Sequence, residues 1–136
     1  MTTKIGFIGL GAMGLPMSSN LQRKGFAVTV YDIDDAKMNQ VVELGAKKAA
    51  NVAEASRGQD IVITVLPATQ HVEAVVLGED GVLANIDAGA LLMDLSTIDA
   101  KGTDRVAAAC AEKGIGFVDA PIGRLALHAQ RGESLF

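Results

Sequence analysis

Short apolar runs rich in β-branched residues alternate along the chain with longer segments in which apolar residues recur at helical spacing. The apolar runs predict strands at Lys4–Leu10, Phe26–Asp32, Ile61–Leu66, Leu91–Leu95 and Gly116–Asp119. The segments between them predict helices at Ala12–Lys24, Ala36–Leu44, between Asn51 and Gly58, from Thr69 onward and at Asp99–Lys113. Because strands and helices alternate, we expect an α/β domain in which a doubly wound, mainly parallel sheet carries helices on both faces.

Polar residues near the segment ends refine these boundaries. Asp34 or Asp35 can cap the second helix, and Asn51 has the spacing of a capping residue for the short third one. Lys47–Lys48 is interpreted as a solvated turn. The last residues, Glu133–Phe136, look like the start of a further strand in which the chain stops. We therefore expect one domain that is a fragment of a longer protein.

Composition places the chain among ordinary folded proteins. Of its 136 residues, 49% are apolar and 21% are charged, so disorder is not expected. The net charge of −4 argues against general binding to nucleic acid or to an anionic membrane. The sequence contains no uninterrupted run of about 20 apolar residues, the length that a membrane-spanning helix needs. The single cysteine, Cys110, allows no internal disulfide and is expected to be buried. The absence of a disulfide framework leads us to expect a cytoplasmic protein. No metal site is expected, because His71 and His128 lack metal-ligand spacing and are interpreted as helical or surface residues.

The most specific local pattern is a glycine-rich turn between the first strand and the first helix. Residues 9–14 are Gly-Leu-Gly-Ala-Met-Gly, and Asp32 ends the next predicted strand 18 residues after Gly14. In such a turn Gly9 permits the tight bend, Gly11 lets a diphosphate approach the backbone, and Gly14 allows close packing of helix and strand. The helix N-terminus attracts the phosphate charge. Asp32 can accept hydrogen bonds from the adenosine ribose and would repel a 2′-phosphate, which favours NAD over NADP.

Other interpretations of this pattern stay open. A glycine-rich turn in a doubly wound fold can bind a different ligand. S-adenosylmethionine-dependent methyltransferases also combine such a loop with an acidic residue at the end of the second strand. Asp32 can instead be a helix cap or a solvated turn residue beside Asp34 and Asp35.

The stretch Phe7–Leu21 resembles the N-terminal signature of the β-hydroxyacid dehydrogenase family, whose members begin with a Rossmann-type NAD-binding domain like that of 6-phosphogluconate dehydrogenase. Four further segments also resemble the family's sequences: Val65–Pro67, Leu77–Val82, Met93–Ile98 and Val118–Pro121. The resemblance implies that the turn contacts the pyrophosphate, that the end of the third predicted strand lines the cofactor cleft, and that Thr97 lies near the nicotinamide. The predicted cofactor-binding residues are Gly9, Leu10, Gly11, Ala12, Met13, Gly14, Asp32, Leu66, Pro67 and Thr97.

The chain departs from the family's pattern after Pro121. Most members continue with Ser-Gly-Gly, which helps to hold a substrate carboxylate, whereas this chain has Gly123 and Arg124. That variant resembles the sulfolactaldehyde reductase branch, in which an arginine at this place binds a sulfonate. A guanidinium can bind a sulfonate or a carboxylate, so the arginine alone does not indicate which of these two groups the substrate carries. The predicted substrate-binding residues are Ser96, Gly123 and Arg124, with helix capping by Ser96 and a surface or interface role for Arg124 as the alternatives.

The resemblance also implies parts that this chain does not contain. Related enzymes carry the lysine that donates the proton on a long helix beyond the nucleotide domain, followed by an all-helical domain, so we expect no catalytic residue in this chain. We expect residues 1–136 to be the dinucleotide-binding domain of an NAD(H)-dependent oxidoreductase acting on a small anionic aldehyde or hydroxyacid. Sulfolactaldehyde is favoured, and succinic, tartronic and methylmalonic semialdehyde remain open.

Two further expectations follow from this assignment. The isolated chain should bind dinucleotide weakly and should not turn over, because the catalytic lysine is missing. The parent protein is expected to be a homo-oligomer. A stand-alone NAD(H)-sensing module without catalysis is the alternative from a different functional class.

Overall fold

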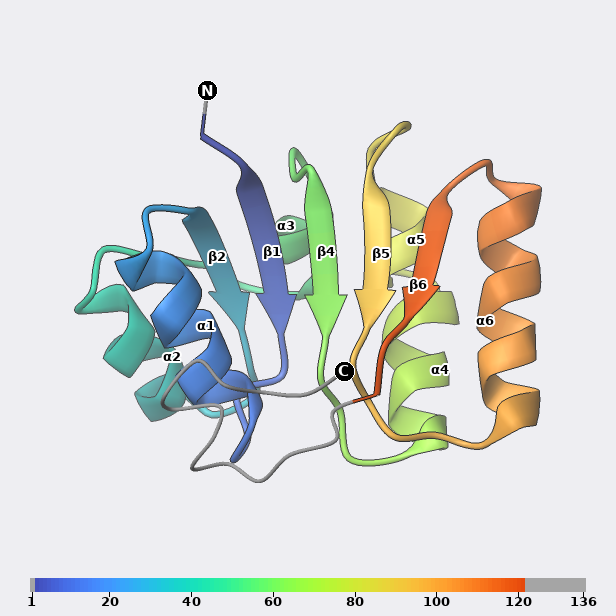
Figure 1. Ribbon diagram of the computed structural model, residues 1–136, viewed down its shortest axis with the longest axis horizontal. Helices are drawn as coiled ribbons and strands as arrows, with labels where there is room; N and C mark the ends of the chain where they lie inside the picture. The colour runs from blue at the N-terminus through green and yellow to red at the C-terminus, as the bar shows by residue number, and fades with distance from the viewer. Residues whose placement is uncertain (1, 122–136) are drawn as a thin grey trace.

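The computed structural model describes residues 2–121, which form one parallel sheet between two layers of helices (Figure 1). The six strands of this part of the chain follow the order β3-β2-β1-β4-β5-β6, and every neighbouring pair is parallel. Their bounds are β1 (Lys4–Ile8), β2 (Ala27–Tyr31), β3 (Lys47–Lys48), β4 (Ile61–Thr64), β5 (Leu91–Asp94) and β6 (Gly116–Asp119). The predicted doubly wound parallel sheet is confirmed.

Helices cover the two faces of the sheet unequally. On one face, α1 (Gly14–Arg23) and α2 (Asp35–Val42) pack against each other and against β1 and β2. The opposite face carries α3 (Val52–Ser56), α4 (Thr69–Leu77), α5 (Val82–Asn85) and α6 (Ala100–Glu112). The chain changes faces between β2 and β4, because β4 returns to lie beside β1 before the chain moves outward to β5 and β6.

Successive residues of the central strands fill two separate cores. In β1, Phe7 packs with Val30 and Met38 beneath α1 and α2, whereas the next residue, Ile8, packs with Val72 of α4. Side chains that alternate across a strand and are buried on both faces are typical of parallel sheets. This two-sided burial explains the continuous apolar runs in the sequence.

Two predicted helix caps are present. The Asp34 carboxylate accepts a hydrogen bond from the Ala36 N–H at 3.0 Å, and the Asn51 side chain accepts one from the Glu54 N–H at 2.8 Å. Because a capping side chain satisfies an amide that the helix itself cannot bond, both helices begin where the polar residues indicate.

Two elements were not foreseen. The prediction that Lys47–Lys48 is a turn is wrong, because these residues pair with β2 as the edge strand β3. Both lysines are exposed, and Lys48 forms an ion pair with Asp35 at 2.7 Å, so the strand has no apolar face that would reveal it. The short helix α5 was also missed, since four residues are too few to show helical periodicity. The strand predicted at Glu133–Phe136 lies outside the described residues.

The described residues contain no helix that is both long and apolar enough to cross a bilayer. Within the same part of the chain, no three His, Cys, Asp or Glu side chains come together as metal ligands. Cys110 is fully buried in α6, as predicted, and burial raises the pKa of its thiol. A thiol with a raised pKa stays protonated at neutral pH, which suits a packing role.

Candidate functional site

The carboxyl ends of β1 and β4 lie side by side where the order of the strands reverses. In open parallel sheets, ligands bind in the crevice outside the strand ends at such a switch point. Here β1 continues through residues 9–13 into α1, and β4 continues through residues 65–68 into α4. These two connections therefore define the candidate site.

The three glycines of the first connection meet different constraints. Gly9 has a φ of +102°, and a Cβ at this position would lie 2.0 Å from the Val65 carbonyl oxygen. A Cβ on Gly14 would lie 1.9 Å from the Gly9 carbonyl oxygen, so α1 packs directly onto the turn. A Cβ on Gly11, in contrast, would meet no atom of the other described residues within 4 Å. Packing thus requires Gly9 and Gly14, whereas Gly11 faces the open space that a ligand close to the backbone would occupy.

α1 begins beside this space without a side-chain cap. Met13 occupies the capping position and makes no side-chain hydrogen bond to the helix, and the first turn holds no acidic residue. Within this first turn the Leu15 N–H already donates to the Gly11 carbonyl oxygen at 3.0 Å, and Pro16 has no N–H, so the helix attracts an anion chiefly through the positive end of its dipole. This end of α1 is therefore suited to bind an anion such as a diphosphate.

Asp32 follows β2 and is tied to the glycine-rich turn. Its Oδ2 accepts a hydrogen bond from the Leu10 N–H at 2.7 Å, and its Oδ1 accepts one from the Asp34 N–H at 2.8 Å. The cap of α2 is Asp34 and not Asp32. Because a carboxylate can accept about four hydrogen bonds, Asp32 keeps acceptor capacity for a ligand after these two.

A cavity of about 650 Å³ is lined by these two connections and by the connection that follows β2, a size common for small-molecule and cofactor sites. The structure brings most of the predicted cofactor-binding residues together around it: Gly9, Gly11, Ala12, Met13, Asp32, Leu66 and Pro67. Leu10 and Gly14 are buried within the turn, and only the Leu10 backbone takes part, through Asp32. Thr97 is exposed beyond the end of β5 and does not line this cavity.

Comparison with known proteins identifies the domain. Residues 4–136 match the model of the NAD binding domain of 6-phosphogluconate dehydrogenase. The 3-hydroxyisobutyrate dehydrogenase of Pseudomonas aeruginosa is 43% identical over 120 residues, which are 88% of this chain and 40% of that protein. The 3-sulfolactaldehyde reductase of Escherichia coli K12 is 40% identical over 131 residues, 96% of this chain and 44% of that protein. The chain belongs to the β-hydroxyacid dehydrogenase family.

The fold agrees with this membership. The structure of the Mycobacterium tuberculosis 3-hydroxyisobutyrate dehydrogenase with L-serine superposes with a TM-score of 0.88 at 32% identity, covering 96% of this chain and 44% of that one. The chain thus corresponds to the NAD-binding domain of β-hydroxyacid dehydrogenases and spans less than half the length of these relatives.

Sequence reasoning overlooked several residues of the cavity wall in this member of the family. Ile33 is 94% exposed after β2, Lys37 borders the cavity from α2, and His71 and Val75 border it from α4. His71, interpreted from the sequence as a helical or surface residue, lies in α4, is exposed and borders the cavity. Positions 71 and 75 are four residues apart and therefore lie on the same face of a helix. This spacing indicates that both side chains border the cavity once α4 is known to lie beside it.

A second group of polar residues lies at the carboxyl end of β5. Asp94 is 1% exposed, and its Oδ1 accepts hydrogen bonds from the Thr64 hydroxyl at 2.9 Å and from the Ser96 N–H at 3.1 Å. Its Oδ2 has no hydrogen-bond partner among the described residues. Asp119 lies opposite Asp94 in the neighbouring strand, and partial burial, together with the charge of Asp94, raises the pKa of the Asp119 carboxyl.

The predicted substrate residues are only partly placed by the structure. Ser96 is 3% exposed, and its hydroxyl oxygen accepts a hydrogen bond from the Leu66 N–H at 2.7 Å. Gly123 and Arg124 lie outside the described residues.

Proposed function

We propose that this chain is the NAD(H)-binding domain of a longer oxidoreductase that transfers hydride between a nicotinamide and a small acidic aldehyde or β-hydroxyacid. The observation that carries the proposal is the meeting of three features around one cavity: the open face of Gly11, the uncapped N-terminus of α1 and the carboxylate of Asp32. A diphosphate and a ribose are the chemical groups that these features suit.

The residues present fit a dinucleotide. The backbone of Gly11, Ala12 and Met13 would hold the pyrophosphate, and Asp32 would accept hydrogen bonds from the adenosine ribose. Leu66 and Pro67 would supply an apolar wall, and Thr97 would lie toward the nicotinamide. The bound nicotinamide would supply the hydride chemistry. Because Asp32 places a negative charge where a 2′-phosphate would lie, we propose that NAD(H) is preferred over NADP(H).

The substrate role rests on Arg124 and Gly123. Among the relatives, one is named a 3-hydroxyisobutyrate dehydrogenase and another a 3-sulfolactaldehyde reductase, and both names describe small anionic compounds. We favour sulfolactaldehyde for this protein because the Gly-Arg pair resembles that branch. The proton for the forming alkoxide would come from a residue outside residues 1–136.

Calorimetric titration of the full-length protein with NADH and with NADPH tests the proposal. We expect heat of binding with NADH. We also expect a lower Kd for NADH than for NADPH, because Asp32 would repel the 2′-phosphate of NADPH. If neither dinucleotide gives heat, the proposed function is wrong. A lower Kd for NADPH would contradict only the role of Asp32.

Arg124→Ala in the full-length protein is expected to raise KM for an acidic aldehyde about tenfold to a hundredfold, the cost of a lost charge-assisted hydrogen bond. The Kd for NADH should stay unchanged. Steady-state kinetics with sulfolactaldehyde and with succinic semialdehyde measures this effect and its substrate dependence. Arg23→Ala is the control, since Arg23 is exposed in the last turn of α1 and donates to Asn20 of the same helix. An unchanged KM in the Arg124 variant would refute the anion-binding role.

A further inference from the structure

The connections that follow β4 and β5 stay in register beyond the ends of the strands. Within the sheet, Thr64 lies opposite Asp94, 30 residues later in the chain. Three hydrogen bonds also connect residues that are 30 positions apart: Thr64 to Asp94, Leu66 to Ser96, and Thr69 to Asp99. The two connections therefore run side by side as far as the first turns of α4 and α6.

The inner contacts place Ser96 through a buried carboxylate. The Asp94 Oδ1 accepts hydrogen bonds from the Thr64 hydroxyl of β4 and from the Ser96 N–H. The Ser96 hydroxyl oxygen in turn accepts the Leu66 N–H at 2.7 Å. The hydrogen bond to this buried carboxylate holds the Ser96 backbone in place, and the Ser96 side chain lies against the Leu66 amide.

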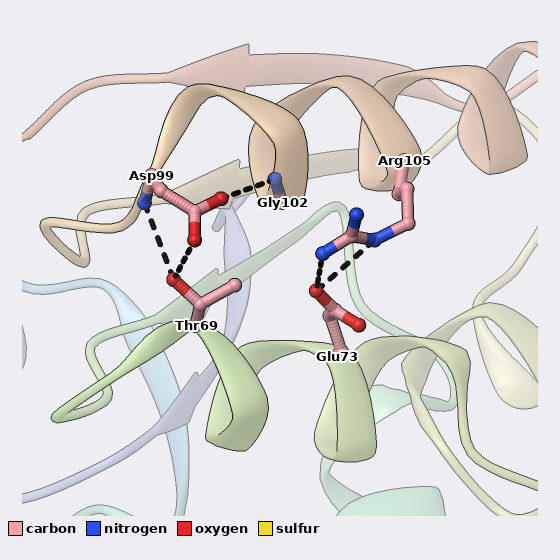
Figure 2. A network of polar contacts seen from close by, with 5 residues as sticks. All are labelled: Thr69, Glu73, Asp99, Gly102 and Arg105. Carbon is pink, nitrogen blue, oxygen red and sulfur yellow. Dashed lines mark hydrogen bonds and ion pairs between the residues drawn. The ribbon is translucent and has the colours of Figure 1, made fainter.

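The outer contacts hold the helices that follow (Figure 2). The Thr69 hydroxyl donates to the Asp99 Oδ2 at 3.3 Å and accepts the Asp99 N–H at 3.2 Å. The Asp99 Oδ1 also caps α6 by accepting the Gly102 N–H at 2.6 Å. One turn further along, Arg105 donates to Glu73. The N-termini of α4 and α6 are thus joined directly, which limits independent movement of the connections that lead into them.

The Leu66 N–H belongs to a peptide that also touches the glycine-rich turn. The carbonyl of this peptide is that of Val65, whose oxygen lies 2.0 Å from the place that a Cβ on Gly9 would occupy. In a planar trans peptide the C=O and N–H groups point in opposite directions. The Val65–Leu66 peptide is therefore held between Gly9 on its carbonyl side and Ser96 on its amide side.

Leu66 and Pro67 form the cavity wall next to this peptide. A residue that precedes proline is restricted to extended conformations, so the orientation of the peptide also determines where Leu66 and Pro67 lie. A rotation of the Val65–Leu66 peptide would change the wall of the cavity and the contact with Gly9 together.

We propose that Ser96 is a positioning residue for the dinucleotide cleft, whose hydroxyl oxygen holds the Val65–Leu66 peptide against the glycine-rich turn. This inference rests on the proposed function, and it replaces the substrate contact that the family resemblance implied for Ser96. A side chain that is 3% exposed and engaged with a backbone amide shapes the site through Leu66 and does not need to touch a ligand.

Ser96→Ala in the full-length protein tests the inference, with Ser56→Ala as the matched control. The Ser56 hydroxyl is also fully buried, but it donates to the Val52 carbonyl oxygen within α3 at 2.8 Å. Each variant removes one buried hydroxyl. For Ser96→Ala we expect faster amide exchange at Leu66, a rise in the Kd for NADH of about tenfold, and an unchanged KM for the acidic aldehyde at saturating NADH. Ser56→Ala should change neither the Leu66 exchange rate nor the Kd.

The possible outcomes separate this inference from the proposed function. If the wild-type protein binds no dinucleotide, the proposed function is wrong. If the wild type binds NADH and Ser96→Ala binds it equally well, only the positioning role is refuted. A rise in substrate KM without a change in the Kd for NADH would also refute it and would favour direct substrate contact. If Ser96→Ala does not fold, Leu66 exchange in the wild type decides: slow exchange supports the inference, and exchange at the rate of a free amide overturns it.

Discussion

Gly11→Ala is expected to weaken NADH binding by the full-length protein at least about tenfold, a loss of about 1.4 kcal/mol, while its thermal unfolding midpoint stays unchanged. Among residues 2–121, a Cβ at this position meets no atom outside the adjoining residues within 4 Å, so the native fold accepts the added methyl group. The same methyl group would stand in the space through which a diphosphate approaches the backbone. Calorimetric titration and thermal unfolding of the same samples measure the two effects.

Gly14→Ala provides the contrasting control. The new Cβ would lie 1.9 Å from the Gly9 carbonyl oxygen, so either α1 or the turn must move. The expected cost is about 3 kcal/mol of unfolding free energy, at the upper end of the range for overpacking. If Gly11→Ala destabilises the protein as strongly as Gly14→Ala does, the open face of Gly11 is refuted. If Gly11→Ala binds NADH normally, the diphosphate does not lie over this residue.

Asp32→Ala is expected to raise the Kd for NADH about tenfold to a hundredfold and to reduce the preference for NADH over NADPH. The variant would lose the proposed ribose acceptor and the negative charge that is proposed to oppose a 2′-phosphate. It also removes the acceptor of the Leu10 and Asp34 amides, so we expect a loss of about 1–3 kcal/mol in unfolding free energy. Parallel titrations with both dinucleotides measure the ratio of the two Kd values.

Asp35→Ala is the matched control for charge. Asp35 lies three residues away, and its exposed carboxylate pairs with Lys48. Through this hydrogen bond and ion pair, Lys48 lowers the pKa of the Asp35 carboxyl. Removal of this carboxylate takes away the same unit charge without changing the cavity wall, so both Kd values should stay as in the wild type. An equal change in both variants would mean that net charge, and not a contact of Asp32, governs affinity.

Local patterns predicted most of the fold and several residues that the structure brings to the candidate cavity. Gly9, Gly11, Gly14 and Asp32 could be identified because turn, helix start and strand end each leave a short-range signature. The edge strand β3 has no such signature, because its two residues, Lys47 and Lys48, are both polar and exposed. His71 and Lys37 were missed because a residue on a helix lines a cavity only when that helix lies over the right strand end.

The sequence by itself determined the alternation of strands and helices, the two-sided burial of the central strands and the glycine-rich turn, because each leaves a characteristic pattern of residue types within a short stretch of the chain. Only the tertiary structure decided that Leu66 meets Ser96, that the Val65 carbonyl lies against Gly9, and that one cavity collects residues from both connections. Such contacts follow from the pairing of β4 with β1 and β5, and that register arises from the packing of the whole domain.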